Sequence, residues 1–296
     1  MNKVAATGPS LSILAQRLLH QPSEEDFRTA PVRVGRHAHP SASEFLASDE
    51  TQQVLAELFG ELGWPSQYGG GVDGLDVRWR TGSHTVILDG RRDGWLWLSV
   101  RRTPALEGSE AERFLRCAAR GPRSEDAGLP YLWRYQRSGP FQLAPATPVA
   151  QDWVQLRSAL EALLCAWSQH LELLVGDKDA GFTIDHGDGQ LAVMVEPRDG
   201  ISVFADRRDG TNRDASHLAD MIERGWHSFI PVLSWWDAYF DRTSAGAAAA
   251  TRLVINELKA RGVRTPSDLR LIRATLGAEG GRLDIPGAGI AIGASE

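Results

Sequence analysis

The chain has 296 residues, of which 42% are hydrophobic and 24% are charged, a globular balance that provides enough residues for two domains or one large one. Its formal net charge of −6 argues against a nucleic-acid partner, because such proteins usually present a clustered basic surface. No segment approaches the roughly 20 apolar residues that a membrane span needs, so no membrane partner is expected.

Local basic spots and the two cysteines bear on the compartment. The arginine pairs are flanked mostly by acids and are expected at solvated hairpin tips; they are Arg91-Arg92, Arg101-Arg102 and Arg207-Arg208. Cys117 and Cys165 fall on apolar faces of predicted helices, which favours two buried free thiols over a disulfide. The N-terminal residues do not resemble a signal peptide. A cytoplasmic protein is therefore expected.

The first half of the chain predicts a leader and one structural unit. Residues 1–43 are expected to form a short helix at 11–19 and a proline-containing linker. Residues 44–145 form the first unit. Its helix begins near Ser48 and ends at Gly63, and the run from Tyr68 to Gly71 is expected to be a flexible connection. Alternating apolar residues then predict strands near 75–79, 86–88 and 95–100, followed by a helix at 108–119.

The second half, residues 150–276, repeats this order. Asp152 is a plausible cap for a helix that runs to Val175, and Gly176 is a plausible stop. Three short strands and a helix are expected next, near 182–184, 191–195, 201–203 and 214–224. A helix at 244–261 and a short helix from Thr265 complete the unit. Residues 277–296 are expected to be a flexible tail.

The two halves can be aligned. Arg92-Asp93-Gly94 and Arg198-Asp199-Gly200 lie 106 positions apart, and the surrounding strands and helices follow at nearly the same offset. The predicted fold class is therefore α+β, with two related units of helix, three-stranded antiparallel sheet and helix, and a possible pseudo-twofold axis. The alternative is a chance alignment of two α+β segments.

No catalytic or metal-binding constellation is complete in the sequence. The chain lacks the nucleophile-elbow, zinc-protease, paired-cysteine and phosphate-loop patterns. His37 and His39 could face one metal but have no evident third ligand, and Asp185-His186 with Asp188 is better explained by a turn. Ser216 and His217 are adjacent on a helix, so they point apart and cannot act as nucleophile and base. No catalytic residue, metal or cofactor is predicted.

Ten tryptophans are the most unusual feature of the composition. Large rings bury much area, so core packing is one interpretation, and an exposed aromatic surface for a protein partner is the other. The candidate partner-binding residues are Trp79, Trp95 and Trp97 in the first half and Trp226, Trp235 and Trp236 in the second.

Residues 218–226, the Trp235-Trp236 pair, the alanine-rich helix after it and the ending at 258–269 resemble the type III secretion chaperone and YbjN-like fold. In particular, they resemble the related peptide-binding chaperone domains of actinobacteria. The similarity covers about 152–276, with the first half as a more divergent copy. It implies a non-enzymatic protein that holds a peptide or partly unfolded protein on sheet and helix surfaces.

The leading hypothesis is thus a chaperone-like module for a protein or peptide partner, either a monomer with pseudo-dimeric halves or a homodimer. Strand addition at a sheet edge or apolar anchors within a polar rim would hold the partner. One alternative is an immunity or inhibitor protein of a bacterial conflict system that binds a basic partner, which the acidic net charge would suit. The other is an enzyme whose catalytic residues are scattered in sequence.

Overall fold

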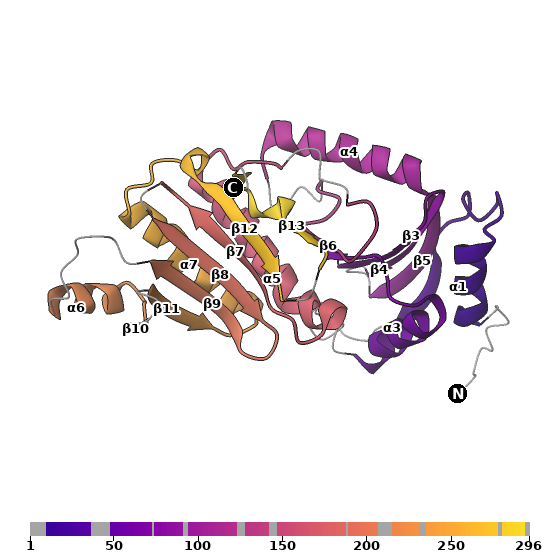
Figure 1. Ribbon diagram of the computed structural model, residues 1–296, viewed down its shortest axis with the longest axis horizontal. Coiled ribbons are helices and arrows are strands. Elements are labelled where there is room, and N and C mark those ends of the chain that lie inside the picture. Colours follow the sequence, from indigo (N-terminus) through magenta and orange to yellow (C-terminus); the bar gives the residue numbers. More distant parts are fainter. Residues whose placement is uncertain are drawn as a thin grey trace.

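The computed structural model describes residues 10–36, 48–72, 74–90, 94–122, 128–141, 147–187, 189–206, 215–230, 235–277 and 280–293. They form an α+β fold with two seven-stranded sheets, here called sheet A and sheet B, which lie side by side (Figure 1). One cluster of buried apolar side chains is shared by elements of both sheets. The α+β class is as predicted.

Sheet A is built mainly from the first half of the chain. Its strand order is β1-β5-β4-β3-β2-β6-β13, and all neighbouring strands are antiparallel. The strands are β1 (Val32–Arg36), β2 (Gln67–Gly70), β3 (Leu75–Arg80), β4 (His84–Gly90), β5 (Trp95–Arg102), β6 (Trp133–Gln136) and β13 (Arg282–Asp284). Helices α1 (Leu11–His20) and α3 (Asp49–Leu62) lie on one side of this sheet, and α4 (Thr103–Arg120) lies on the other (Figure 1).

Sheet B is built from the second half. Its strand order is β10-β11-β9-β8-β7-β12-β14, antiparallel except for the parallel pair β12–β14. The strands are β7 (Ala180–Asp185), β8 (Gln190–Glu196), β9 (Gly200–Asp206), β10 (Ser228–Ile230), β11 (Trp235–Phe240), β12 (Arg270–Leu276) and β14 (Ala291–Ile292). Helices α5 (Trp153–Val175) and α7 (Ser244–Ala260) cover one face, whereas α6 (Ala215–Glu223) projects away from the sheet (Figure 1).

Helix boundaries follow the capping residues closely. Ser48 accepts a hydrogen bond from the Thr51 amide at the start of α3, and Asp152 accepts one from the Gln155 amide at the start of α5. The predicted boundaries of these two helices are confirmed. Helix α4 starts at Thr103, five residues before the predicted start, because it continues directly from β5 with Pro104 in its first turn.

Helix α5 joins the two halves. Its side chains pack on sheet B, and it also contacts β2 and the 3₁₀ turn η2 (Pro286–Ala288). The Trp167 ring meets Phe182 of β7 on one side and Trp133 of β6 on the other, with ring centroids 5.8 and 6.4 Å away. The two halves therefore share a core instead of being tethered by a linker.

Three predicted flexible or irregular segments are ordered, and those predictions are wrong. Residues 32–36 of the expected linker pair with β5 as β1, and the expected Tyr68–Gly71 connection is largely strand β2, buried between β3 and β6. Residues 280–293 of the expected tail enter both sheets as β13 and β14, with Ile290 fully buried. These residues gain their order from tertiary pairing, which local composition does not report.

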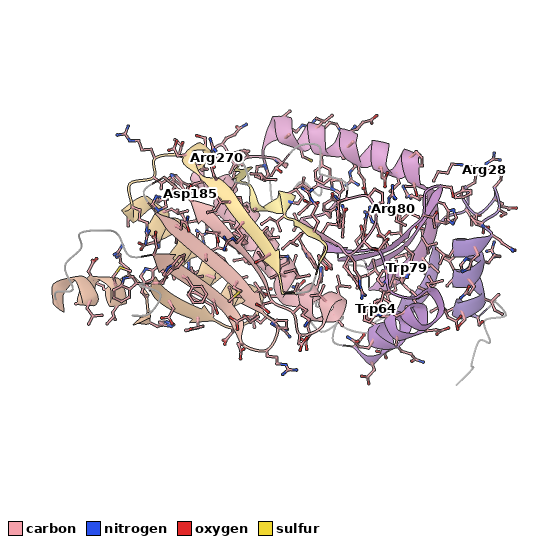
Figure 2. The ribbon with its side chains drawn as sticks, viewed as in Figure 1. Arg28, Trp64, Trp79, Arg80, Asp185 and Arg270 are labelled. Carbon is pink, nitrogen blue, oxygen red and sulfur yellow. The ribbon has the colours of Figure 1, made fainter. Side chains whose placement is uncertain are left out.

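The C-terminal end of the second unit also differs from the prediction. The short helix expected from Thr265 is the three-residue 3₁₀ turn η1 (Pro266–Asp268), with the predicted capping pair of Thr265 and Asp268. The chain then enters β12, where Arg270 lies opposite Asp185 of β7 (Figure 2). Strand β12 was not predicted.

Candidate functional surface

The six predicted tryptophans divide into a buried set and a half-buried set. Trp79, Trp226 and Trp236 are buried, with 4%, 1% and 5% of their surface exposed. Trp95, Trp97 and Trp235 are half-buried. The prediction of a partner surface is therefore wrong for the first three and remains a prediction for the other three.

The buried set is held by hydrogen bonds as well as by packing. The Trp79 indole N–H donates to the Gly63 carbonyl oxygen at 2.9 Å, and its ring packs against Phe59 beside α3 (Figure 2). The Trp226 indole N–H donates to the Glu257 carboxylate at 3.1 Å. Buried indoles with a satisfied N–H contribute to core stability and cannot contact a partner in this structure.

Trp95 and Trp97 are placed by the alternation of β5. Leu96, Leu98 and Val100 point into the core, so the tryptophans face the opposite side of the sheet. The register sets Arg36 of β1 opposite Trp95 and Arg33 opposite Trp97. We call these four residues the Trp–Arg face.

The arginines of the Trp–Arg face stack on its rings. The Arg33 guanidinium carbon lies 4.6 Å from the Trp95 ring centroid and 4.8 Å from that of Trp97, and Arg36 lies 5.1 Å from Trp95. Such contacts are favourable, and because the N–H groups lie in the plane of each guanidinium, stacking leaves them able to donate to an acceptor. Both arginines are exposed.

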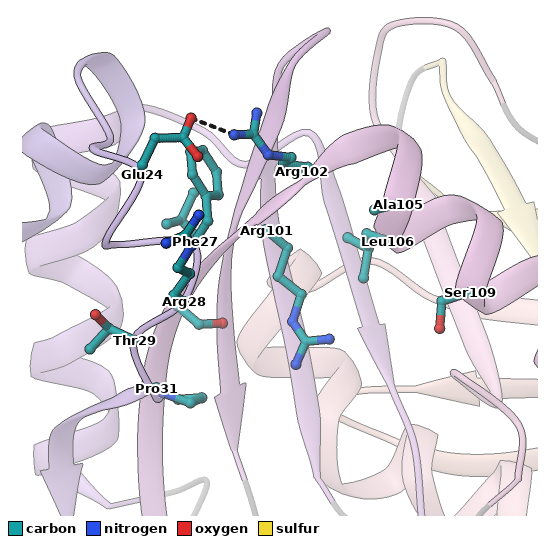
Figure 3. Close-up of a pocket in the computed structure, with 12 residues that line it drawn as sticks. Glu24, Phe27, Arg28, Thr29, Pro31, Arg101, Arg102, Ala105, Leu106 and Ser109 are labelled. Carbon is teal, nitrogen blue, oxygen red and sulfur yellow. Dashed lines mark hydrogen bonds and ion pairs between the residues drawn. The ribbon is translucent and has the colours of Figure 1, made fainter.

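A pocket of about 560 Å³ adjoins this face near the end of β5 (Figure 3). One wall is the segment 24–31, and the other is formed by β5 and the first turns of α4. Its lining residues are Glu24, Phe27, Arg28, Thr29, Pro31, Ser99, Val100, Arg101, Arg102, Ala105, Leu106 and Ser109. Ser99 and Arg101 follow Trp97 at every second position and so share its side of β5, whereas Val100 and Arg102, which also line the pocket, belong to the other side.

Two of the three arginines in the pocket are available to a ligand. Arg102 donates to Glu24 at 2.5 Å and lies over the Phe27 ring at 4.5 Å (Figure 3). This hydrogen bond and the charge of Arg102 lower the pKa of Glu24. In the described part of the chain, Arg28 and Arg101 make no side-chain hydrogen bond or ion pair, and both are exposed. The lining holds these three arginines and the single carboxylate of Glu24, so the pocket carries a net positive charge.

Ion pairs join α4 to the strands beneath it, on the side of sheet A that α4 covers. Arg78 donates to Asp76 and to Glu110 of α4, each at 2.6 Å, and Arg80 donates to Glu107 at 2.6 Å. Although burial opposes it, the charges of Asp76 and Glu110 raise the pKa of Arg78. These groups satisfy one another, so they fix α4 and leave no reactive group.

The clusters of ionisable residues noted in the sequence do not form a metal site within the described residues. No three His, Cys, Asp or Glu side chains among them are placed to hold a metal. The Asp185 carboxylate accepts from the Gly187 amide at 3.1 Å, as a turn requires. His37, His39 and Asp188 lie outside the described residues, as do the side chains of Ser216 and His217.

Other predicted features are placed as follows. Cys117 and Cys165 are free thiols, as predicted, but they are half-buried instead of buried. Arg101 and Arg102 lie where β5 passes into α4 and not at a hairpin tip, and the other two arginine pairs lie outside the described residues. Within the described chain, no helix combines the length and apolar character needed to cross a bilayer.

Phe27, Arg28, Arg33 and Arg36 were missed because the segment from 21 to 43 was interpreted as a linker. Only the alternation of Trp95, Trp97, Ser99 and Arg101 could have indicated this side of the sheet.

In comparisons with models of protein families, curated proteins and solved structures, nothing matches this chain. Its function is therefore inferred from the surface itself.

Proposed function

We propose that this protein is a non-catalytic, chaperone-like binding module that holds an extended protein or peptide segment on the Trp–Arg face. The observation that carries the proposal is a row of two half-buried tryptophans beside an edge strand. Aromatic and arginine side chains are the types enriched at binding hot spots, where a large ring provides much of the contact area.

Strand β1 offers the backbone for such a partner. Among the described residues it pairs with β5 alone, and the side chain of Val32 is 40% exposed. An unpaired strand edge presents alternating amide and carbonyl groups that an extended segment can pair with. The backbone would then supply affinity for many sequences, while the rings of Trp95 and Trp97 select apolar side chains.

The element order supports the resemblance to secretion-chaperone and YbjN-like domains. Residues 153–260 run as helix, three strands, helix, two strands, helix. The first half runs as α3, β2–β5 and α4, which is the same plan with one additional strand. We infer that the halves are related units, with a possible pseudo-twofold axis, in a cytoplasmic protein that is a monomer or a homodimer.

The alternative functions are less well supported by the site. An inhibitor of a basic toxin would need an acidic surface, yet the Trp–Arg face and the adjoining pocket are basic. An enzyme would need convergent acid, base or nucleophilic groups, and the pocket holds one carboxylate that is already paired with Arg102. An aromatic, basic surface is instead suited to a binding function.

A peptide array tests this proposal. Purified protein is incubated with immobilised unrelated 12-residue peptides, alongside a Trp95→Ser/Trp97→Ser double variant. The matched control is Trp64→Ser, which removes an indole that is 66% exposed but lies at the end of α3 (Figure 2). We expect the double variant to lose binding to most bound peptides and the control to retain it. Equal binding by the double variant, or no binding by the unmodified protein, would refute the proposal.

A further inference from the structure

The pocket beside the Trp–Arg face has the composition of a carboxylate site. We propose that it receives acidic side chains of the bound segment, so that the partner is an extended peptide with an apolar part and an acidic part. This inference rests on the proposed function. It adds the chemical class of the partner and the position of its acidic residues relative to its apolar residue.

Charge is the first step of the inference. Arg102 is hydrogen-bonded to Glu24, and the charge of Arg28 on the same wall also acts on Glu24, whereas Arg101 on the other wall makes no side-chain hydrogen bond or ion pair in the described part of the chain (Figure 3). A guanidinium binds a carboxylate with two parallel hydrogen bonds, which gives both energy and orientation. A carboxylate between the two walls would be bound from two sides.

The lining between the arginines strengthens such a pair. Pro31, Ala105 and Leu106 contribute apolar surface, and the Ser99 and Ser109 hydroxyls supply neutral donors. Both guanidiniums are exposed, so the hydroxyls and the second arginine must add to an attraction that is modest for a single exposed pair. The volume of about 560 Å³ is in the usual range for ligand pockets, so it accommodates more than one side chain.

Strand geometry gives the spacing that the partner needs. Trp97 and Arg101 lie on one side of β5, four residues apart, which corresponds to about 13 Å of extended chain. A segment running along β5 or β1 has the same rise per residue. A residue over Trp97 and an acidic residue in the pocket should therefore be separated by four positions.

The test uses three labelled probes and fluorescence polarisation at fixed salt concentration. The first is a threonine-rich 12-residue peptide with a central leucine and a glutamate four positions away on each side. The second replaces both glutamates with glutamine, and the third is a 12-nucleotide single strand of DNA. The variants are Arg28→Gln/Arg101→Gln and, as a matched control, Arg252→Gln on the exposed side of α7.

We expect the glutamate peptide to bind about tenfold more tightly than the glutamine peptide. This preference should disappear in Arg28→Gln/Arg101→Gln and persist in Arg252→Gln, with circular dichroism showing that both variants are folded. An Arg101→Glu variant should prefer a peptide with lysine at the same two positions, which a merely destabilised protein would not do.

The other outcomes separate the inference from the function it rests on. If the glutamate and glutamine peptides bind equally well, the carboxylate site is overturned while peptide binding stands. If neither peptide binds, both proposals fail. If the DNA strand binds more tightly than the glutamate peptide and depends on Arg28 and Arg101, the pocket recognises a phosphate backbone and the acidic-peptide inference is wrong.

Discussion

Sheet A is covered on both sides, whereas sheet B has helices on one side only (Figure 1). The difference follows from the outward residues of the central strands. In sheet A these include Asp76, Arg78 and Arg80, which pair with one another and with the glutamates of α4. In sheet B they include Thr183 and Ala192, both half-buried, which tolerate water without a covering helix.

The helices that follow the two three-stranded meanders, α4 and α6, also differ in the surfaces that they form. Helix α4 crosses its sheet and, with segment 24–31, encloses the basic pocket. Helix α6 leaves its sheet and exposes Leu218 and Ile222. The two halves thus use the same order of elements to make different surfaces, and the candidate binding surface belongs to the covered sheet.

Removing a buried arginine should have the largest effect on stability, and it tests whether both halves depend on ion pairs. Arg78→Met leaves Asp76 and Glu110 facing each other, whereas Arg261→Met leaves Asp206 without its cation but leaves Glu257 paired with Arg224. An uncompensated buried charge costs about 3 to 5 kcal/mol, so Arg78→Met should lose about 3 kcal/mol of unfolding free energy and Arg261→Met should lose less. Urea denaturation measures both.

The exposed pair of Arg157 and Glu161 on α5 provides the control for these variants. Arg157→Met should change the unfolding free energy by less than about 1 kcal/mol, because surface pairs contribute little. A loss at Arg78 no larger than that at Arg157 would show that α4 is held by apolar contacts alone.

Acid should destabilise the junction between the halves through His170. This imidazole of α5 is buried beside Gly70 and Trp133, and burial lowers its pKa to about 4. The unfolded chain takes up a proton below about pH 6.5, but the folded chain resists protonation until about pH 4. Stability from the neutral imidazole is therefore complete above pH 6.5 and is lost as the pH falls to 4, by about 3 kcal/mol.

The measurement compares urea midpoints from pH 7.5 to pH 4.5 for the unmodified protein and His170→Leu. The variant should lose less stability over this range, because it has no group to protonate at the junction. His20→Gln, on the exposed side of α1, should behave like the unmodified protein. Identical pH dependence in all three would exclude His170 as the cause.

The junction also shows how far the sequence predicts this fold. Helices α3, α5 and α7 and the two meanders were predictable, because periodicity and caps are local signals. Strands β1, β2, β12 and β13 were not, since each depends on pairing with distant residues; β1, β2 and β13 are also short or contain glycine. The pocket combines residues 24–31 with 99–109, so neither segment identifies it alone, while Trp95 and Trp97 were found by alternation.

Adding one methyl group to a glycine of each sheet should reveal a further difference in stability between them. Gly70→Ala in β2 would drive a Cβ atom into His170 Nδ1 and leave it 2.6 Å from Trp133 Nε1. Overpacking of this kind costs about 1 to 3 kcal/mol. Gly181→Ala in β7 meets the Val193 carbonyl oxygen at 3.1 Å and two Met194 atoms at 3.5 and 3.7 Å, so it should cost less than Gly70→Ala. Thermal unfolding of both variants measures the difference, and equal melting temperatures would contradict the tight junction.

The smallest expected effect concerns the helix that precedes each meander. The Asp152 carboxylate accepts from the Gln155 amide at 2.8 Å, whereas Ser48 Oγ accepts from the Thr51 amide at 3.3 Å. The shorter bond is charge-assisted and also interacts with the helix dipole, so Asp152→Ala should cost about 1 kcal/mol and Ser48→Ala about 0.5 kcal/mol. Only the Asp152 effect should shrink in 0.5 M salt, since screening acts on charge. If the stability loss in Ser48→Ala also shrinks in salt, a charged interaction contributes at the start of α3, and the starts of α3 and α5 are stabilised in the same way.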